Sequence, residues 1–513
     1  MTAFEASRRG AEASSLAVID VGSNTARLVV YAITPDGGFY PVTSEKEVPR
    51  LGKDTAEDGS LDPVRIQRGV ASLRRFAHRL DRFGRLRTVA VATSAVRDAP
   101  NRDEFLNAVR RETGLRLEVI SGEREGRYAF LGASAAWELG RDLIVDLGGG
   151  SLQIVSTTKG RLERVDSLPL GALRLTQQFL KHDPPTKDEL DELREHVRAQ
   201  LSASLQNMSA PPERVFAAGG SVRELARASI AIRNYPIPQV HGYELRRRDL
   251  EALGEILAEM PDDRRRAVPG ISRSRAEVIV ASTVVLRELL RATERSALIT
   301  NANGIREGIV AESARAALPA PAETLAYRCV TARALGFGYG LEHGSEVRRR
   351  AIDGFEAMAE EYSWGSEERT ALSIAAWMHD IGELIEPWEH SRHSAYVLRH
   401  TALYGVTHRG VALAVLAAFL HEGDDPPEGW RHEWAPVLDN EGLETARRFG
   451  ALLLLAETLA GTAVRVDWDA RAERVTLRFR GPAGGEAPNR SLSRVTAPIR
   501  RAFGWEVVLP DGG

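Results

Sequence analysis

Short apolar runs that end in an acidic residue and a small-residue turn occur twice along the chain. Near the start, an apolar stretch ends at Asp20, a turn follows over Gly22–Thr25, and a second β-branched stretch begins. The same order recurs at Asp146, with the turn at Gly148–Ser151. Each pattern predicts two buried strands joined by a tight turn. Because glycine-rich turns can expose successive backbone N–H groups to an anion, the pair predicts two half-sites facing each other across a cleft.

A third small-residue turn follows the apolar run Val215–Ala218. It consists of Gly219, Gly220 and Ser221, and helical periodicity begins directly after it. A strand, a glycine pair and a helix N-terminus form a further anion site. An aspartate beside bound phosphate normally requires a cation between the two. The three turns together predict a phosphate chain bound with Mg²⁺.

The remaining pattern from about residue 16 to 316 alternates strand and helix in two similar rounds. It predicts helices near 63–83, 103–113, 123–139 and 306–316, and strands near 39–44, 88–92, 116–120, 215–218 and 297–300. This alternation indicates an α/β core with an internal duplication.

The character of the chain changes after a Pro-Ala-Pro-Ala stretch at 319–322, which predicts a linker. Residues 323–465 show helical periodicity and contain eight of the twelve histidines. Residues 466–513 predict short strands at 475–479 and 506–509, a loop at 481–485, and one helix. The first fifteen residues lack an apolar stretch and predict a disordered tail.

Chain length, charge and cysteine content limit the kinds of protein that this chain can be. A chain of 513 residues is too long for one core and predicts several domains. The net charge of −3 gives no overall argument for a nucleic-acid or membrane partner, and the apolar runs are too short to span a bilayer. The single cysteine, Cys329, cannot form an intramolecular disulfide. We therefore expect a cytoplasmic protein with neither nucleic-acid nor membrane partners.

Six motifs occur in an order that matches a known family. They are Asp20–Thr25, Thr93–Arg97, Ser121–Arg127, Asp146–Ser151, Ala218–Ser221 and Gly304–Gly308. With them the chain resembles the exopolyphosphatase/guanosine-pentaphosphate phosphatase (Ppx/GppA) family, within the acetate kinase–sugar kinase–actin superfamily. The histidine-rich part resembles the extra C-terminal domains of the long forms, which are related to HD hydrolases.

The resemblance implies a fold of duplicated actin-like, ribonuclease H-like lobes. The first lobe would cover 16–126, with a helix at 303–316 returning to it, and the second would cover 127–302. An all-α HD-like domain over 323–465 and a small α/β domain over 466–513 would follow.

The resemblance also implies an activity. The protein would be a hydrolase that removes the terminal phosphate of inorganic polyphosphate, or the 5′ γ-phosphate of guanosine pentaphosphate (pppGpp) in the stringent response. The family needs Mg²⁺, with Mn²⁺ as an alternative, and often forms homodimers.

The matching positions assign roles to individual residues. The family's catalytic glutamate precedes a Gly/Ala-Arg pair, so Glu125 becomes the group that orients water. Asp146 and Asp20 become the Mg²⁺ ligands. The phosphate-binding set is Ser23, Asn24, Thr25, Arg97, Gly148, Gly149, Gly150, Ser151, Gly219, Gly220 and Ser221. Arg124 stands where the family often has an acidic residue, which changes the charge beside Glu125.

The histidine-rich region departs from active HD hydrolases. His343, His379 and Asp380 look like the start of a metal site, in which imidazole and carboxylate ligands hold a divalent ion. Glu383 stands where a lysine is usual, however, and Glu457 where the last aspartate ligand is usual. His390, His393, His400 and His421 are either further ligands or structural residues. The departures favour a structural domain over a second active metal site.

Four functions compete on this evidence. They are an exopolyphosphatase, a guanosine-pentaphosphate phosphatase, a kinase of the same superfamily, and a non-enzymatic sensor of the alarmone. Polyphosphate is the favoured substrate because no clear guanine-binding signature is visible. Glu125 and its motif argue against the kinase, and Glu125 together with both Asp-Gly turns argues against the sensor, since pure binding needs no water-orienting carboxylate.

Overall fold

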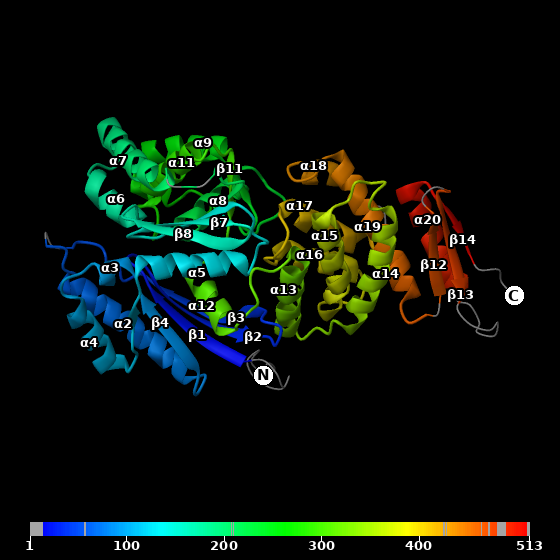
Figure 1. Cartoon of the computed structure of the whole chain (residues 1–513), viewed down its shortest axis with the longest axis horizontal. Helices are drawn as coiled ribbons and strands as arrows, with labels where there is room; N and C mark the ends of the chain where they lie inside the picture. Colours follow the sequence, from blue (N-terminus) through cyan, green and yellow to red (C-terminus); the bar gives the residue numbers. More distant parts are fainter. Residues whose placement is uncertain are drawn as a thin grey trace. The chain divides into compact units, whose positions relative to one another are not determined.

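The computed structural model describes residues 14–55, 58–206, 208, 210–423, 426, 428–462, 464–469, 472–479 and 489–509. The described residues form two compact units (Figure 1). The first comprises the chain up to Asn234 together with Val240–Ala320, and the second comprises Tyr235–Gln239 and the chain from Pro321 onward. The break between Ala320 and Pro321 lies within the predicted linker.

The first unit begins with a five-stranded sheet. Its strands are β1 (Ser14–Val21), β2 (Ala26–Ile33), β3 (Phe39–Glu47), β4 (Arg87–Ala92) and β5 (Glu118–Val119), in the order β3-β2-β1-β4-β5. β1 pairs with β2 in antiparallel and with β4 in parallel fashion. Helices α2 (Pro63–Asp81) and α4 (Arg102–Thr113) cover one face, where Phe76 and Phe105 are fully buried. Ser14 and Ser15 already belong to β1, so the predicted tail is too long by these two residues, and its earlier part lies outside the described residues.

A second sheet repeats this arrangement. Its strands are β6 (Asp142–Leu147), β7 (Leu152–Thr158), β8 (Arg161–Leu168), β9 (Arg214–Ala218), β10 (Glu244–Arg246) and β11 (Ala297–Thr300), in the order β10-β11-β9-β6-β7-β8. Without the edge strand β10, the order and the strand directions match those of the first sheet. The predicted duplication is therefore confirmed.

Helices surround the second sheet. They are α6 (Ala172–Phe179), α7 (Lys187–Leu205), α8 (Gly220–Ile232), α9 (Arg247–Glu259), α10 (Asp262–Arg265) and α11 (Ile279–Ala292). α6, α7, α8, α9 and α11 lie on one face of the sheet, and α5 (Gly122–Ser134) lies on the other (Figure 1).

Helix α5 links the two sheets. A Cβ on Gly126 would lie 2.3 Å from the Val165 side chain, so the glycine lets α5 pack directly on β8. The predicted boundary between the lobes at 126/127 falls inside this helix. The helix ends at Ser134, five residues before the predicted end, and a short turn leads on to β6. Helix α12 (Ile305–Ser313) packs on α5 and β1, as predicted for a segment that returns to the first lobe.

The second unit is mostly helical. It contains α13 (Ala322–Phe337), α14 (Glu342–Met358), α15 (Ser366–Met378), the 3-10 helix η1 (Ile381–Leu384), α16 (His390–His400), α17 (His408–Leu420), α18 (Trp430–Trp434) and α19 (Asn440–Leu459). Strands β12 (Val464–Asp469), β13 (Arg474–Phe479) and β14 (Glu506–Val508) form a small sheet with α20 (Asn489–Phe503).

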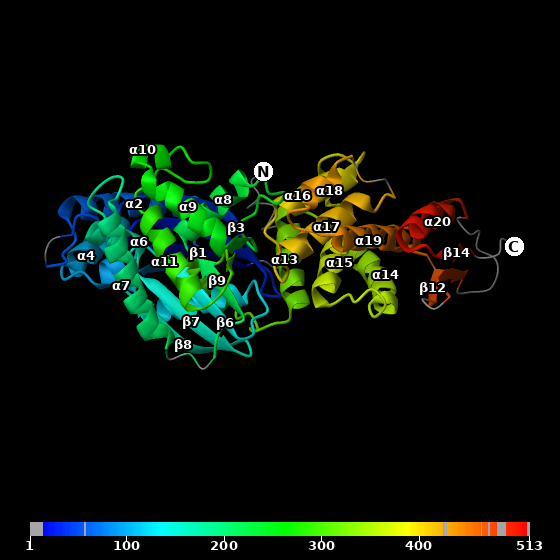
Figure 2. The ribbon, with the colours of Figure 1, turned by 90° about the horizontal axis from the view of Figure 1, so that it is seen from above.

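The C-terminal sheet shares its core with the helices before it. Val475, Ile499 and Trp505 belong to the same apolar cluster as Phe449 of α19. Figure 2 shows α20 close to the end of α19. The sequence pattern missed β12, which begins before the predicted boundary at 466, and the predicted loop at 481–485 lies outside the described residues. Among the described residues, no helix is long and apolar enough to cross a membrane.

Candidate active site

The two predicted hairpin turns have the same geometry. In the first, the Gly22 N–H donates to the Thr25 carbonyl at 2.9 Å, and in the second the Gly148 N–H donates to the Ser151 carbonyl at 3.0 Å. Asp20 and Asp146 occupy equivalent positions at the ends of β1 and β6. The duplicated fold therefore places the two carboxylates at corresponding points of the two sheets.

The two turns meet each other. The Ser23 hydroxyl lies 2.9 Å from that of Ser94, the first residue of α3 (Ser94–Arg97). A Cβ on Gly150 would lie 2.3 Å from the Ser94 Oγ and 2.6 Å from the Ser23 Oγ. The absence of a side chain at Gly150 therefore lets the second turn pack directly against Ser23 and Ser94.

The second turn is oriented by the start of α6. The carbonyl of Gly148 accepts from the Ala172 N–H at 3.0 Å, and that of Gly149 accepts from the Leu173 N–H at 2.8 Å. The Arg174 side chain donates to the Gly150 carbonyl at 2.9 Å. Since the C=O and N–H of a trans peptide point in opposite directions, the amide N–H groups that follow these carbonyls point away from α6. An anion-binding turn requires this orientation, and the binding of phosphate by this turn stays a prediction.

The third turn begins helix α8. Gly219 has φ +119°, and a Cβ there would lie 2.4 Å from the Leu147 carbonyl oxygen, so only glycine fits. The next residue, Gly220, starts the helix, and the N-terminus of α8 carries the partial positive charge of its dipole. The Arg275 guanidinium lies over Gly220, where a Cβ would come within 1.9 Å of its Nη2.

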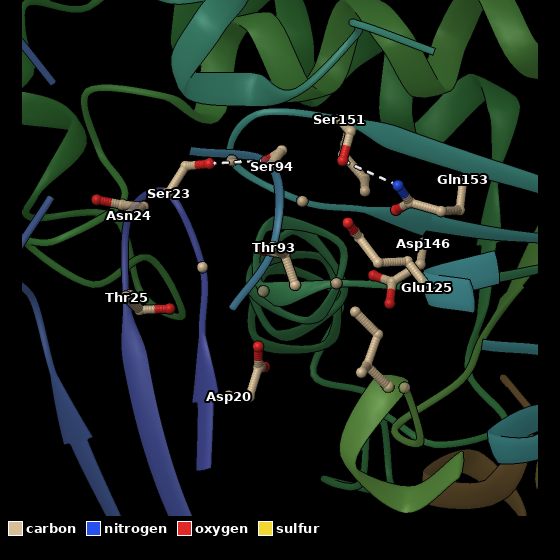
Figure 3. A pocket seen from close by; sticks show the side chains of 18 of the residues that line it. Asp20, Ser23, Asn24, Thr25, Thr93, Ser94, Glu125, Asp146, Ser151 and Gln153 are labelled. Carbon is tan, nitrogen blue, oxygen red and sulfur yellow. Dashed lines mark hydrogen bonds between the residues drawn. The ribbon is translucent and has the colours of Figure 1, made fainter. Parts of the chain in front are cut away.

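A cleft lies between the turns (Figure 3). Most of the predicted site residues line it, namely Asp20, Ser23, Asn24, Thr25, Glu125, Asp146, Gly148, Gly149, Ser151, Gly219 and Gly220. Three predicted residues do not line it. Gly150 packs behind the wall, Ser221 is fully buried and lies 3.4 Å from Arg275 Nη1, and Arg97 contacts Glu125.

Three carboxylates face the cleft, with Glu125 and Asp146 close together and Asp20 opposite them (Figure 3). Burial raises the pKa of Asp146 to about 6, an effect that Arg223 opposes and Asp20 reinforces. Burial also raises the pKa of Asp20, although Arg306 Nη1 lies 3.3 Å from its Oδ2 and works against the rise. The two aspartates therefore form a desolvated, mutually repelling pair that a cation would stabilise.

Glu125 lies in the first turn of α5 and is only 2% exposed. Burial raises its pKa to about 7, against the opposing effect of the Arg97 guanidinium, while Asp146 and Asp20 raise it further. Arg97 contacts Oε1 and also donates to the Ile120 carbonyl at 3.2 Å. A carboxylate with a pKa near neutrality, with one oxygen held and the other available, is suited to general-base catalysis.

Four arginines that were not predicted as site residues also line the cleft. They are Arg27, Arg223, Arg275 and Arg306. Burial lowers the pKa of Arg223 to about 9, and the positive charges of Arg306, Arg27 and Arg275 lower it further. Such crowding of like charge is favourable only when an anion lies among them. Three of these arginines could have been found from their positions in the sequence. Arg27 and Arg223 lie two residues after two of the three predicted turns, and Arg306 lies in the motif Gly304–Gly308.

The cleft residues fit a magnesium ion. Asp20 and Asp146 supply buried carboxylate oxygens, the ligand type that Mg²⁺ prefers. Burial raises the pKa of both carboxyl groups, and a bound cation would stabilise their ionised forms.

Comparison with known proteins agrees with this geometry. The profile of the Ppx/GppA phosphatase family matches residues 29–317, and that of the family's domain III matches residues 327–424. The chain belongs to the Ppx/GppA phosphatase family. The family match begins just beyond the first turn. It includes the second and third turns, Glu125, and three of the four cleft arginines, namely Arg223, Arg275 and Arg306.

Two relatives are named for different substrates. Exopolyphosphatase 1 of Mycobacterium tuberculosis is 34% identical over 299 residues, which is 58% of this chain and 87% of the relative. Guanosine-5'-triphosphate,3'-diphosphate pyrophosphatase of Vibrio campbellii is 27% identical over 395 residues, covering 76% of this chain and 77% of the relative.

Solved structures of the family share the fold of the first unit. The Aquifex aeolicus family member has a TM-score of 0.51 at 32% identity, covering 59% of this chain and 97% of that one. An exopolyphosphatase from Cytophaga hutchinsonii has a TM-score of 0.55 at 25% identity, covering 59% and 98%. These likenesses confirm the duplicated α/β lobes, whereas the likeness of the helical unit to HD hydrolases stays a prediction.

Proposed function

We propose that the protein is an exopolyphosphatase that hydrolyses the terminal phosphate of inorganic polyphosphate, with water oriented by Glu125. The observation that carries the proposal is the position of Glu125, a buried carboxylate with a pKa near 7 in a cleft lined by arginines and glycine turns. This combination supplies a base and an anion site within one cavity.

The chain's own groups divide the work of binding. The turns at Ser23–Thr25 and Gly148–Ser151 would hold the terminal phosphate through backbone N–H groups. The N-termini of α8 and α12 also line the cleft, at Gly220 and Ile305, and add positive potential there. Arg27, Arg223 and Arg275 would contact the phosphates further along the chain, where their charge is neutralised by the substrate.

The reaction proposed is an in-line hydrolysis. The oxygen of a water molecule attacks the terminal phosphorus, the bond from that phosphorus to the bridging oxygen breaks, and the shortened chain leaves with that oxygen. The free Oε2 of Glu125 accepts the proton from the attacking water, while Arg97 holds Oε1 in place. Glu125 then returns the proton to solvent, and the products are orthophosphate and a polyphosphate shorter by one unit.

Asp146 and Asp20 would hold Mg²⁺, or Mn²⁺ in its place. When bound, the ion neutralises charge on the phosphate oxygens and helps to align the substrate. Arg306 occupies one oxygen of Asp20, which leaves the other oxygen available as a ligand.

Guanosine pentaphosphate is the second candidate substrate. One observation favours it: the Vibrio campbellii relative, which is named for that nucleotide, aligns with 76% of this chain and therefore extends well beyond the first unit. The homodimer and the cytoplasmic location stay predictions.

Product analysis tests the proposal directly. We would incubate the protein with Mg²⁺ and a long polyphosphate and follow both orthophosphate and chain length on a gel. We expect orthophosphate from the first minutes, with no fragments of intermediate length accumulating by internal cleavage. Mid-chain fragments without orthophosphate would contradict an exopolyphosphatase.

A further inference from the structure

A cluster of histidines and carboxylates lies within the second unit, in residues that the proposed reaction does not use. It consists of His343, His379, Asp380, His390, His421 and Glu457. These residues come from five different α-helices and the start of η1: α14, the C-terminus of α15, α16, the C-terminus of α17, and α19. Residues far apart in sequence are thus brought together by the packing of the helices.

Three of the imidazoles are fixed in the same tautomer. The Nδ1 atoms of His379 and His421 lie 2.9 Å and 2.7 Å from the carbonyls of the residues three positions earlier, and the Nδ1 of His390 lies 3.2 Å from the Pro387 carbonyl. A carbonyl oxygen only accepts, so each Nδ1 carries the proton and donates it. In the neutral ring, Nε2 is then left with its lone pair exposed.

These lone pairs point at atoms that also only accept. His379 Nε2 lies 3.0 Å from Glu457 Oε2 and 3.1 Å from Asp380 Oδ2. His390 Nε2 lies 3.1 Å from His421 Nε2 and 3.2 Å from Asp380 Oδ1. Lone pairs facing one another at these distances require a cation between them, either a proton or a metal ion. Backbone carbonyls that hold the far ring nitrogen are also how proteins orient metal-binding histidines.

The distances fit shared metal ions. Two ligands at about 2.1 Å from one ion and at right angles are about 3.0 Å apart. Around Asp380 Oδ2, the Nε2 atoms of His379 and His343 lie at 3.1 Å and 3.5 Å. Glu457 Oε2 lies 2.7 Å from the same His343 nitrogen, so four ligand atoms surround one position. A second position lies between Asp380 Oδ1, His390 and His421.

We propose that this cluster binds two divalent first-row transition-metal ions bridged by the Asp380 carboxylate. One ion would be held by His343, His379 and Glu457 and the other by His390 and His421. Mixed imidazole and carboxylate ligands favour Mn²⁺, Fe²⁺, Co²⁺ or Zn²⁺ over Mg²⁺ and Ca²⁺, which prefer oxygen alone. His379 is fully buried, whereas the His343 and Glu457 side chains are 46% and 35% exposed, so the first ion would be reachable from solvent.

The test measures metal content of the full-length chain. The purified protein is stripped with a chelator, loaded with Co²⁺, and desalted into excess Mg²⁺ so that the cleft carboxylates hold Mg²⁺. It is then assayed by elemental analysis and by the visible absorption of Co²⁺. We expect about two ions per chain, falling to about one in His343→Ala and in His390→Ala, and to nearly none in Asp380→Asn. His400→Ala is the matched control, because His400 lies on the same helix as His390 and has the same type of Nδ1 bond outside the cluster. It should retain the wild-type content.

A second control separates this cluster from the cleft. Asp146→Asn, in the first unit, should leave the Co²⁺ content unchanged if the ions belong to the histidine cluster. Loss of Co²⁺ in Asp146→Asn but not in Asp380→Asn would contradict the proposal, because the ions would then belong to the cleft. Failure of the wild-type chain to retain Co²⁺ would also contradict it and would leave protons as the cations of the cluster. Circular dichroism of every variant excludes misfolding as the cause of a loss.

Discussion

Arg97 holds one carboxylate oxygen of Glu125 and leaves the other free. The guanidinium also donates to the Ile120 carbonyl at 3.2 Å, so it is fixed against the strand end that precedes α5. The family resemblance places Arg97 in the phosphate-binding set, which stays a prediction. In the structure Arg97 contacts Glu125 and is not among the residues that line the cleft. We expect this contact to position the proposed base.

Replacement of Arg97 tests this role. Arg97→Ala should lower turnover at pH 7 by about tenfold or more, with little change in KM, because the pKa of Glu125 rises further when the guanidinium is removed. Turnover should recover in part as the pH rises. Arg110→Ala is the control, since Arg110 is exposed on α4 and does not line the cleft. A raised KM with unchanged kcat and pH profile would return Arg97 to the phosphate-binding set.

The pH profile reports on Glu125. Its pKa is raised by burial from 4.5 to about 7, so the base is lost by protonation as the pH falls through this range. At saturating Mg²⁺ we expect kcat to fall by about tenfold per pH unit on the acid side, with an apparent pKa between 4.5 and 7, since a nearby cation favours the carboxylate. An apparent pKa at or below 4.5 on the acid side of the kcat profile would exclude Glu125 as the titrating group.

Asp146 should control the metal requirement. Asp146→Asn removes one charged ligand atom, and we expect the Mg²⁺ concentration for half-maximal rate to rise by about tenfold or more. Activity is titrated with Mg²⁺ at saturating polyphosphate, with Glu163→Gln on the exposed edge of β8 as control. Superimposable titrations of the wild type and Asp146→Asn would remove this residue from the metal site.

Arg223 should act on binding more than on chemistry. Its positive charge lies among three other arginines, and bound polyphosphate would supply the missing negative charge. We expect Arg223→Ala to raise KM by about tenfold or more and to reduce the dependence of KM on salt. Arg227→Ala, one turn along the same helix and exposed, should behave as the wild type. An unchanged salt dependence in Arg223→Ala would contradict a phosphate contact.

Local patterns predicted much of the fold because strands and turns leave strong signals over a few residues. The apolar run before Asp146 and the glycines after it define β6 and its turn without knowledge of the partners. Very short helices and strands were missed because they contain too few residues to give such a signal. α3 has four residues and β10 three, too few for a periodic pattern to show.

The parts of the site formed by backbone turns could be predicted from the sequence. The parts formed by side-chain contacts between distant residues could not. The three glycine turns reveal themselves in sequence, whereas Arg275 lies far from any turn and reaches the cleft through its contact with Gly220. The contact of Arg97 with Glu125 likewise joins residues 28 positions apart. In the second unit, the pattern of histidines could not show that five side chains surround both oxygens of Asp380.

The most direct test of the central claim is phosphate release by Glu125→Gln. Because the pKa of Glu125 is about 7 in the folded protein and 4.5 as a free group, protonated Glu125 stabilises the fold. This contribution to the free energy of unfolding is complete below pH 4.5 and is lost as the pH rises through about 7. The neutral glutamine should therefore keep the free energy of unfolding at pH 8 at or above that of the wild type.

Release of orthophosphate is measured with Mg²⁺ from long-chain polyphosphate and from guanosine pentaphosphate, at equal concentrations of terminal phosphate. We predict faster release from polyphosphate, and a loss of at least about a hundredfold in Glu125→Gln with the fold intact. Faster release from the nucleotide would assign the protein to alarmone metabolism. Turnover near that of the wild type in Glu125→Gln would contradict the mechanism.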